Sequence, residues 1–155
     1  MKRGALVLAI LWINFLISAC SDEKISREDE VRQYIESGVA AAEDRSSGDI
    51  AKLIDASYFD ERNFTKTQLT KLIRLYFFRV KNIHLFTKID RIEFIAENEV
   101  LVTLHVAMAG SVISDPSLLS SIRARFYKFE LELVKQDEWL LQRARWQSAS
   151  MGDMQ

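Results

Sequence analysis

Very few of the residues that build cross-links, tight turns or metal centres occur in this chain. Its 155 residues include one cysteine, two histidines, one proline and five glycines. A single cysteine cannot form a disulfide within the chain, so packing must hold the fold together. The motifs H-E-x-x-H, C-x-x-C, G-x-S-x-G and the P-loop are also absent. We therefore expect no metal and no cofactor.

A strong charge of either sign is missing as well. Lys and Arg number 21 against 22 Asp and Glu, for a formal net charge of −1. Without a net positive charge, nucleic acid is not expected as a partner. Hydrophobic residues make up 48% of the chain, which is enough for a core, and the length fits one domain.

The N-terminus has the three parts of a secretory signal. Met1–Arg3 is short and basic, Ala5–Ile13 is an unbroken apolar run, and small residues precede Cys20. A bilayer span needs about 20 apolar residues, so this run is too short to cross one. Asn14 interrupts the run, which favours a cleaved signal over residues 1–19 and makes an uncleaved membrane anchor the alternative.

The segment Ile17-Ser18-Ala19-Cys20 resembles the lipobox of bacterial lipoproteins. The resemblance implies that a diacylglyceryl group joins the Cys20 thiol, that residues 1–19 are removed and that the new amino terminus is acylated. Residues 20–25 would then form the lipidated N-terminus and a short tether. Ser21 suits sorting to the inner leaflet of the outer membrane, facing the periplasm. An ordinary signal peptide with a chance cysteine is the alternative.

Helical patterns follow the tether. Ser26 and Asp29 resemble a capping box, and apolar residues then recur at helical spacing as far as Ala42. The segment "RSSGD" predicts that this helix ends with Gly48 as its C-terminal glycine. Asp49 is then expected to cap a short second helix.

A third helix is predicted by a Thr65–Gln68 capping box. The apolar residues that share one face of it are Leu69, Leu72, Ile73, Tyr76, Phe77 and Val80. After Asn82 the apolar period becomes two, which predicts strands. These strands are expected at residues 84–96, with a bulge, and at 100–108, 125–134 and 139–149.

The last two strands read as a hairpin with Gln136 and Asp137 as its two-residue loop. This register places apolar residues opposite one another on one face, and Glu130 opposite Arg143 on the other. The expected apolar pairs are Leu133 with Leu140, Phe129 with Ala144, and Tyr127 with Trp146. A bulge near the turn would shift the register.

The only proline lies in a long connection between two strands. Asp115 as N-cap and Pro116 at the first helical position predict a short helical turn there. The connection is either a lid over a pocket or a plain linker.

The order of helices and strands predicts an α+β fold, in which the N-terminal helices pack on a curved antiparallel sheet of about four strands. This pattern resembles the cone-shaped nuclear transport factor 2-like (NTF2-like, or SnoaL-like) fold. The resemblance rests on "SSGDIAKLID", "NIHLFTKIDRIEF" and the final pair "FYKFELELV" and "EWLLQRARW". It implies an NTF2-like domain at residues 26–149, followed by a flexible tail at 150–155.

Catalytic members of that fold place an Asp, or an Asp and a His, inside the cone. The weak candidates here are Asp90, His84 and His105, and the alternation in the second strand directs His105 away from the core. The aromatic residues expected to line or fill the cone are Tyr34, Tyr76, Phe77, Tyr127, Phe129 and Trp146. Two arginine pairs, Arg123 with Arg125 and Arg143 with Arg145, indicate either a charge ladder or an anion site.

Two functional hypotheses follow from these observations. The first is a lipid-anchored, non-catalytic envelope module that binds a protein partner or a small hydrophobic ligand. The second is a small cone-pocket enzyme of the isomerase or dehydratase type. A cone filled by aromatic side chains would favour the first, and a buried acid or histidine facing an open pocket would favour the second.

Overall fold

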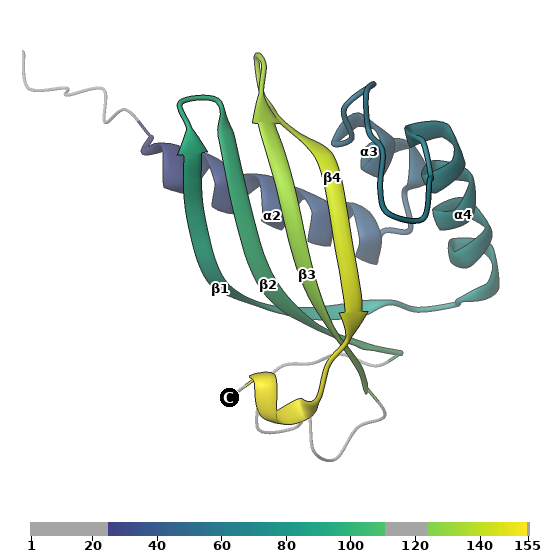
Figure 1. Cartoon of the computed structure of the whole chain (residues 1–155). Helices are drawn as coiled ribbons and strands as arrows, with labels where there is room; N and C mark the ends of the chain where they lie inside the picture. Colours follow the sequence, from purple (N-terminus) through teal and green to yellow (C-terminus); the bar gives the residue numbers. More distant parts are fainter. Residues whose placement is uncertain (1–24, 111–123, 155) are drawn as a thin grey trace, which may run out of the picture.

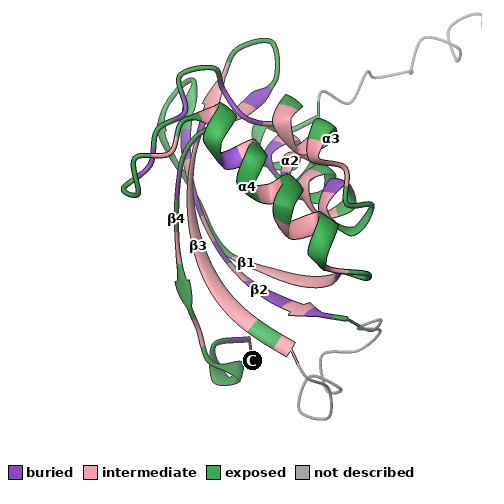
Figure 2. Cartoon of the chain, turned by 90° about the vertical axis from the view of Figure 1, so that its right-hand side faces the viewer, coloured by how far each residue is buried: buried purple, intermediate pink, exposed green. Residues whose placement is uncertain are grey.

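Helices lie against the concave face of a curved antiparallel sheet (Figures 1 and 2). The computed structural model describes residues 25–110 and 124–154. The expected turn at Asp115 and Pro116 lies outside them, as does Arg123. The helices are α2 (Arg27–Glu43), α3 (Ser47–Lys52) and α4 (Lys66–Arg79), with a final 3-10 turn, η3 (Met151–Met154). The strands are β1 (His84–Ala96), β2 (Glu99–Ala109), β3 (Ala124–Lys135) and β4 (Trp139–Ser148), paired in that order.

The starts of the two longer helices are as predicted. The Asp29 N–H donates to Ser26 Oγ at 3.1 Å before α2. Three acidic residues in the first turn of α2 also oppose its positive dipole end. Before α4, the Thr65 N–H donates to Gln68 Oε1 at 2.9 Å. The capping-box pattern therefore predicted both helix starts correctly.

The predicted link between the first two helices was wrong. Helix α2 ends at Glu43, and Arg45 takes a left-handed φ of 54°. Ser46, rather than Asp49, caps α3, because the Asp49 N–H donates to Ser46 Oγ at 3.2 Å. A Ser-x-x-Asp cap thus starts α3 early and places Gly48 inside the helix.

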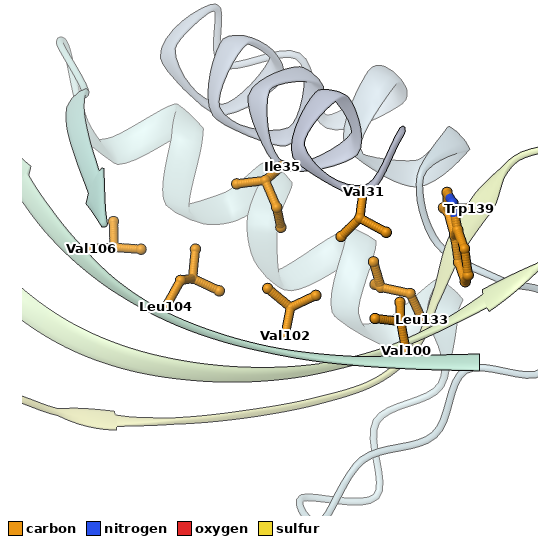
Figure 3. Packing of buried hydrophobic residues seen from close by; sticks show 8 residues of the cluster. All are labelled: Val31, Ile35, Val100, Val102, Leu104, Val106, Leu133 and Trp139. Atoms are coloured by element: carbon orange, nitrogen blue, oxygen red, sulfur yellow. The ribbon is translucent and has the colours of Figure 1, made fainter. Parts of the chain in front are cut away.

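The main core lies between the first half of α2 and the sheet. Val31 and Ile35 project from α2 onto the side chains of β2 (Figure 3). The predicted inward stripe of β2 is confirmed, because Val100, Val102 and Leu104 are buried. The expected bulge in β1 occurs between Ile89 and Arg91, so Asp90 is the extra residue.

The register of the β3–β4 hairpin differs from the prediction. The connection spans three residues, because Lys135 pairs with Trp139, and a register irregularity lies between Glu132 and Leu133. Beyond it the pairing is offset by two residues, so Phe129 faces Trp146 instead of Ala144. Tyr127 faces Ser148. An even offset keeps the residues beyond the irregularity on their predicted faces. Nearer the turn the offset is one residue, so Leu133 faces Leu141 instead of Leu140, and the predicted faces of these two β4 leucines were wrong.

A salt bridge joins the start of α2 to this hairpin. Lys135 Nζ lies 2.9 Å from Glu30 Oε2, and Trp139 Nε1 donates to the same oxygen at 3.1 Å. The hydrogen bond from Lys135 is the largest cause that lowers the pKa of Glu30. The contact closes the end of the main core where Trp139 is buried.

The C-terminal segment covers part of the sheet's outer face. Where a flexible tail was expected, η3 buries Met154 against Ala107, which is fully buried (Figure 1). The alternation of β2 placed Ala107 on the outer face, and that prediction holds; its partner Met154 was not foreseen. Two apolar side chains in contact give the tail a fixed position.

Candidate binding cavity

A cavity of about 520 Å³ lies between the helices and the concave face of the sheet. Its size is within the range of about 300–1,000 Å³ that small-molecule sites occupy. The side chains around it come from all three helices, the α3–α4 loop and all four strands. They are Tyr34, Ile35, Gly38, Val39, Ala42, Ile50, Leu53, Ile54, Arg62, Leu69, Leu72, Ile73, Tyr76, Phe77, Leu85, Thr87, Leu104, Val106, Met108, Phe129, Leu131, Leu141, Ala144 and Trp146.

Small residues in the second half of α2 leave this space open. The first half of the helix brings Val31 and Ile35 onto the sheet, whereas the second half brings Gly38, Val39 and Ala42 to the cavity. A Cβ added at Gly38 would meet only Leu53 Cδ1, at 3.9 Å. This is an ordinary van der Waals distance, so the packing around position 38 does not require a glycine. The side chain that Gly38 lacks therefore leaves extra space in the cavity. The run "SGVAAA" was a sequence signal for this cavity that the helical pattern alone did not reveal.

Five of the six predicted aromatic residues line the cavity. They are Tyr34, Tyr76, Phe77, Phe129 and Trp146. Tyr127 does not, although it lies on the same face of β3 and its ring is tilted against Phe129 with 6.2 Å between centroids. Tyr127 is close to the start of β3, in the part of the sheet that extends beyond the helices (Figure 2). The aromatic rings therefore form walls and do not fill the interior.

Two tyrosine hydroxyl groups in the wall donate hydrogen bonds. Tyr34 donates to the Leu53 carbonyl at 3.0 Å, and burial raises the pKa of its phenol. Tyr76 donates to Met108 Sδ at 3.0 Å, and a thioether is a weak acceptor. No carboxylate and no histidine occurs among the described lining residues. Histidine, aspartate and glutamate are the side chains that most often act as general bases, and the described lining has none of them.

The three weak catalytic candidates lie away from this cavity. His105 Nδ1 is 2.6 Å from Asp90 Oδ2, with side-chain exposures of 12% and 29%. The structure thus brings together a pair that the sequence left unconnected: Lys88 pairs with His105, and Asp90 lies two residues further along β1 on the same outer face. That nitrogen still makes no hydrogen bond of good angle in the described part of the chain. His84 starts β1 opposite Ala109 and does not line the cavity either.

The arginines of β4 belong to a charge ladder on the outer face. Arg143 lies 3.8 Å from Glu132, and Arg145 lies 3.4 Å from Glu132 and 3.6 Å from Glu130. Arg145 is also 3.5 Å from Glu61 of the α3–α4 loop. This outcome favours the ladder over an anion site at these two residues.

A buried carboxylate organises the loop between α3 and α4. Asp60 is 2% exposed and accepts hydrogen bonds from the Tyr58 hydroxyl at 2.8 Å, the Arg62 N–H at 2.9 Å and the Phe64 N–H at 3.0 Å. Burial, followed by the hydrogen bond to Asp60, raises the pKa of Tyr58. The loop places the Arg62 guanidinium 4.4 Å above the Trp146 ring. The segment "ASYFDERN" has the composition of a loop, and the arrangement around Asp60 was not predicted from it.

Helix α4 also presents apolar side chains to solvent. Leu72, Leu75 and Phe78 are 43%, 49% and 91% exposed. Leu72 thus departs from the predicted buried face, although it reaches the edge of the cavity.

No group of three or more metal-ligating side chains occurs in residues 25–110 and 124–154. None of the helices described in these ranges has the length and apolar character needed to span a bilayer.

Comparison with solved structures identifies the fold. A scytalone dehydratase-like protein from Novosphingobium aromaticivorans superposes with a TM-score of 0.64 at 13% identity, covering 78% of this chain and 83% of that one. A protein of the NTF2-like family from Streptomyces avermitilis, described as a dehydratase, gives 0.60 at 11% identity and coverages of 79% and 95%. A ketosteroid isomerase-like protein from Erwinia carotovora atroseptica gives 0.59 at 10% identity and coverages of 84% and 99%.

The chain therefore has the NTF2-like α+β fold that its sequence pattern predicted. Identities this low establish a shared fold and nothing about chemistry. No family model matches the chain. No curated protein matches it in sequence either.

Proposed function

We propose that this protein is a lipid-anchored, non-catalytic module of the bacterial cell envelope that holds a small apolar molecule in its cavity. The observation that carries the proposal is the open cavity of about 520 Å³ with an almost wholly apolar lining. Transfer of apolar surface out of water contributes about 25 cal/mol per Å², so such a wall retains an apolar ligand without further chemistry.

The interior is open and is not the aromatic-filled cone that was expected to favour a non-catalytic module, but the residues of its lining support binding over catalysis. Isomerase-like and dehydratase-like neighbours are compatible with an enzyme of this fold, but an enzyme of either kind needs a proton acceptor near its substrate. The described lining offers the hydroxyl groups of Tyr34, Tyr76 and Thr87 and the guanidinium of Arg62, but no carboxylate and no histidine, which are the commonest proton acceptors in catalysis. The contact between Asp90 and His105 lies on the opposite face of the sheet.

The lipobox-like segment supports the anchor. Acyl chains contribute about 0.8 kcal/mol per buried CH₂, and one chain alone binds a membrane only marginally. Three chains on Cys20 would make attachment effectively permanent. We expect the Cys20→Ala precursor to incorporate no labelled palmitate and to leave the membrane fraction, with Ser21→Ala as a matched control that keeps the label. Equal labelling of Cys20→Ala would rule out lipidation at this residue.

Binding is tested with a neutral probe whose fluorescence rises in apolar surroundings, such as N-phenyl-1-naphthylamine. The wild type should bind it saturably. Gly38→Phe should lower the affinity at least about tenfold, since the ring would occupy the space that the glycine leaves open. Gly38→Ala is the matched control, because a single methyl changes the cavity little. The proposal fails if the wild type shows no saturable binding or if Gly38→Phe binds as well as Gly38→Ala.

A further inference from the structure

We propose that the ligand of this cavity carries one anionic group, a carboxylate or a phosphate, and that Arg62 at the cavity mouth binds it. The inference rests on the proposed binding function and adds the chemical class of the ligand: an apolar body with a single negative head. The supporting observations are the place of Arg62, its lack of an ion pair, and the contacts that hold it.

Arg62 lies where two depressions meet. It lines the apolar cavity and also a polar depression of about 230 Å³ next to β4, which contains charged side chains. Because Arg62 is exposed and lines both, it lies at the mouth of the apolar cavity. A ligand with its apolar part inside would bring a polar head to this residue.

The charge of Arg62 is available to such a head. The other cations of the depression are engaged: Lys128 lies 3.6 Å from Glu130, and Arg145 lies 3.5 Å from Glu61. In the described part of the chain, Arg62 makes no ion pair. Its two acidic neighbours in sequence have other partners, because Glu61 lies 3.5 Å from Arg145 and Asp60 accepts three hydrogen bonds from its own loop.

The guanidinium is also held in place before a ligand arrives. Its central carbon, Cζ, lies over the Trp146 ring at 4.4 Å from the ring centre, and the turn around Asp60 fixes the Arg62 backbone N–H. A guanidinium stacked on an aromatic face keeps its edge N–H groups free, and these match a carboxylate or phosphate in two parallel hydrogen bonds. Trp146 contacts Arg62 and also lines the cavity, so the apolar wall begins directly beside the guanidinium. Head and tail sites are therefore adjacent.

The test compares probes that share a ten-carbon chain and differ in the head: decanoate, decyl phosphate, decanol and decylammonium. Binding is measured by calorimetry to the full lipidated chain in nanodiscs of zwitterionic lipid, with empty nanodiscs subtracted. Wild type should bind decanoate or decyl phosphate about five- to tenfold more tightly than decanol, and decylammonium more weakly, since a partly exposed charge pair adds a modest amount. The better of the two anions identifies the head.

The variants separate a charge role from a structural one. Arg62→Gln should bring the anion down to the affinity of decanol and leave decanol unchanged, whereas Arg62→Lys should keep most of the preference. A loop that merely loosens would weaken both probes alike, so an unchanged anion-to-decanol ratio in Arg62→Gln overturns this inference. If anion and decanol bind equally to the wild type and Gly38→Phe weakens both, the inference is wrong and the proposed function stands. If no probe binds, or Gly38→Phe has no effect, the proposed function fails with it.

Discussion

Replacing Gly38 by alanine should stabilise the protein, and this result tests whether the cavity exists. Gly38 is an interior residue of α2, where glycine is less favourable than alanine by about 0.5–1 kcal/mol. The new methyl would meet Leu53 Cδ1 at 3.9 Å, an ordinary contact that adds a few tenths of a kcal/mol of burial at a wall that stays half open. The free energy of unfolding should therefore rise by about 1 kcal/mol.

Urea unfolding of the domain from Ser21 onward measures this change. The midpoint should rise at constant slope, and the melting temperature should rise by about 3–5 °C for a domain of this size. A fall in stability of 1 kcal/mol or more would refute the reasoning, because it would mean that α2 packs tightly at Gly38 and that no cavity lies beside it. Ser37→Ala, at the exposed neighbouring position, controls for a general effect of alanine on the helix.

Two further predictions concern the sheet and pH. Phe129→Ala should cost about 3 kcal/mol, because it removes a half-buried ring stacked on Trp146, while Glu132→Ala should cost less than about 1 kcal/mol as a partner in the outer charge ladder. If urea unfolding showed a larger loss of stability for Glu132→Ala than for Phe129→Ala, the assignment of the inner and outer faces of the sheet would be wrong. Glu30 has a lowered pKa in the folded state, so its charge stabilises the fold above the unfolded value of about 4.3, and this contribution is lost as pH falls through the folded value. Glu30→Gln should therefore show a smaller drop in urea midpoint between pH 7 and pH 3 than wild type, and an equal drop would contradict the role of its contact with Lys135.

Much of the fold could be predicted from local patterns. The period-two stripe of β2 and the capping boxes at Ser26 and Thr65 depend on neighbouring residues only, and all three are present in the structure. The β3–β4 register was predicted less well, because alternation alone does not encode the irregularity between Glu132 and Leu133, and the segment after α3 pairs with β4 close to it. Leu53 O accepts from the Leu141 N–H at 2.9 Å, a contact between distant segments that no local pattern encodes.

The aromatic residues around the cavity could be predicted from the sequence, but the arrangement of the site could not. Aromatic residues at helical and strand spacing indicated which side chains surround the interior, and Phe77 and Trp146 do line it. Whether they fill or wall the interior depends on the size of the α2 residues opposite them, such as Gly38. The position of Arg62 could not be predicted from the sequence, because it depends on the hydrogen bond of its N–H to Asp60, a buried carboxylate in a segment with the composition of a loop.

The central claim, that an apolar molecule binds inside the cavity, is tested most directly by locating a bound neutral ligand such as decanol by NMR. Intermolecular nuclear Overhauser effects should connect the ligand to the methyl groups of Leu104 and Leu131, which line the cavity from the sheet. Leu75 on the solvent-facing side of α4 is 49% exposed and provides the internal comparison. Effects to Leu104 and Leu131 with none to Leu75 are the predicted result. Effects to Leu75 alone would place the ligand on the outer surface of α4 and contradict the account.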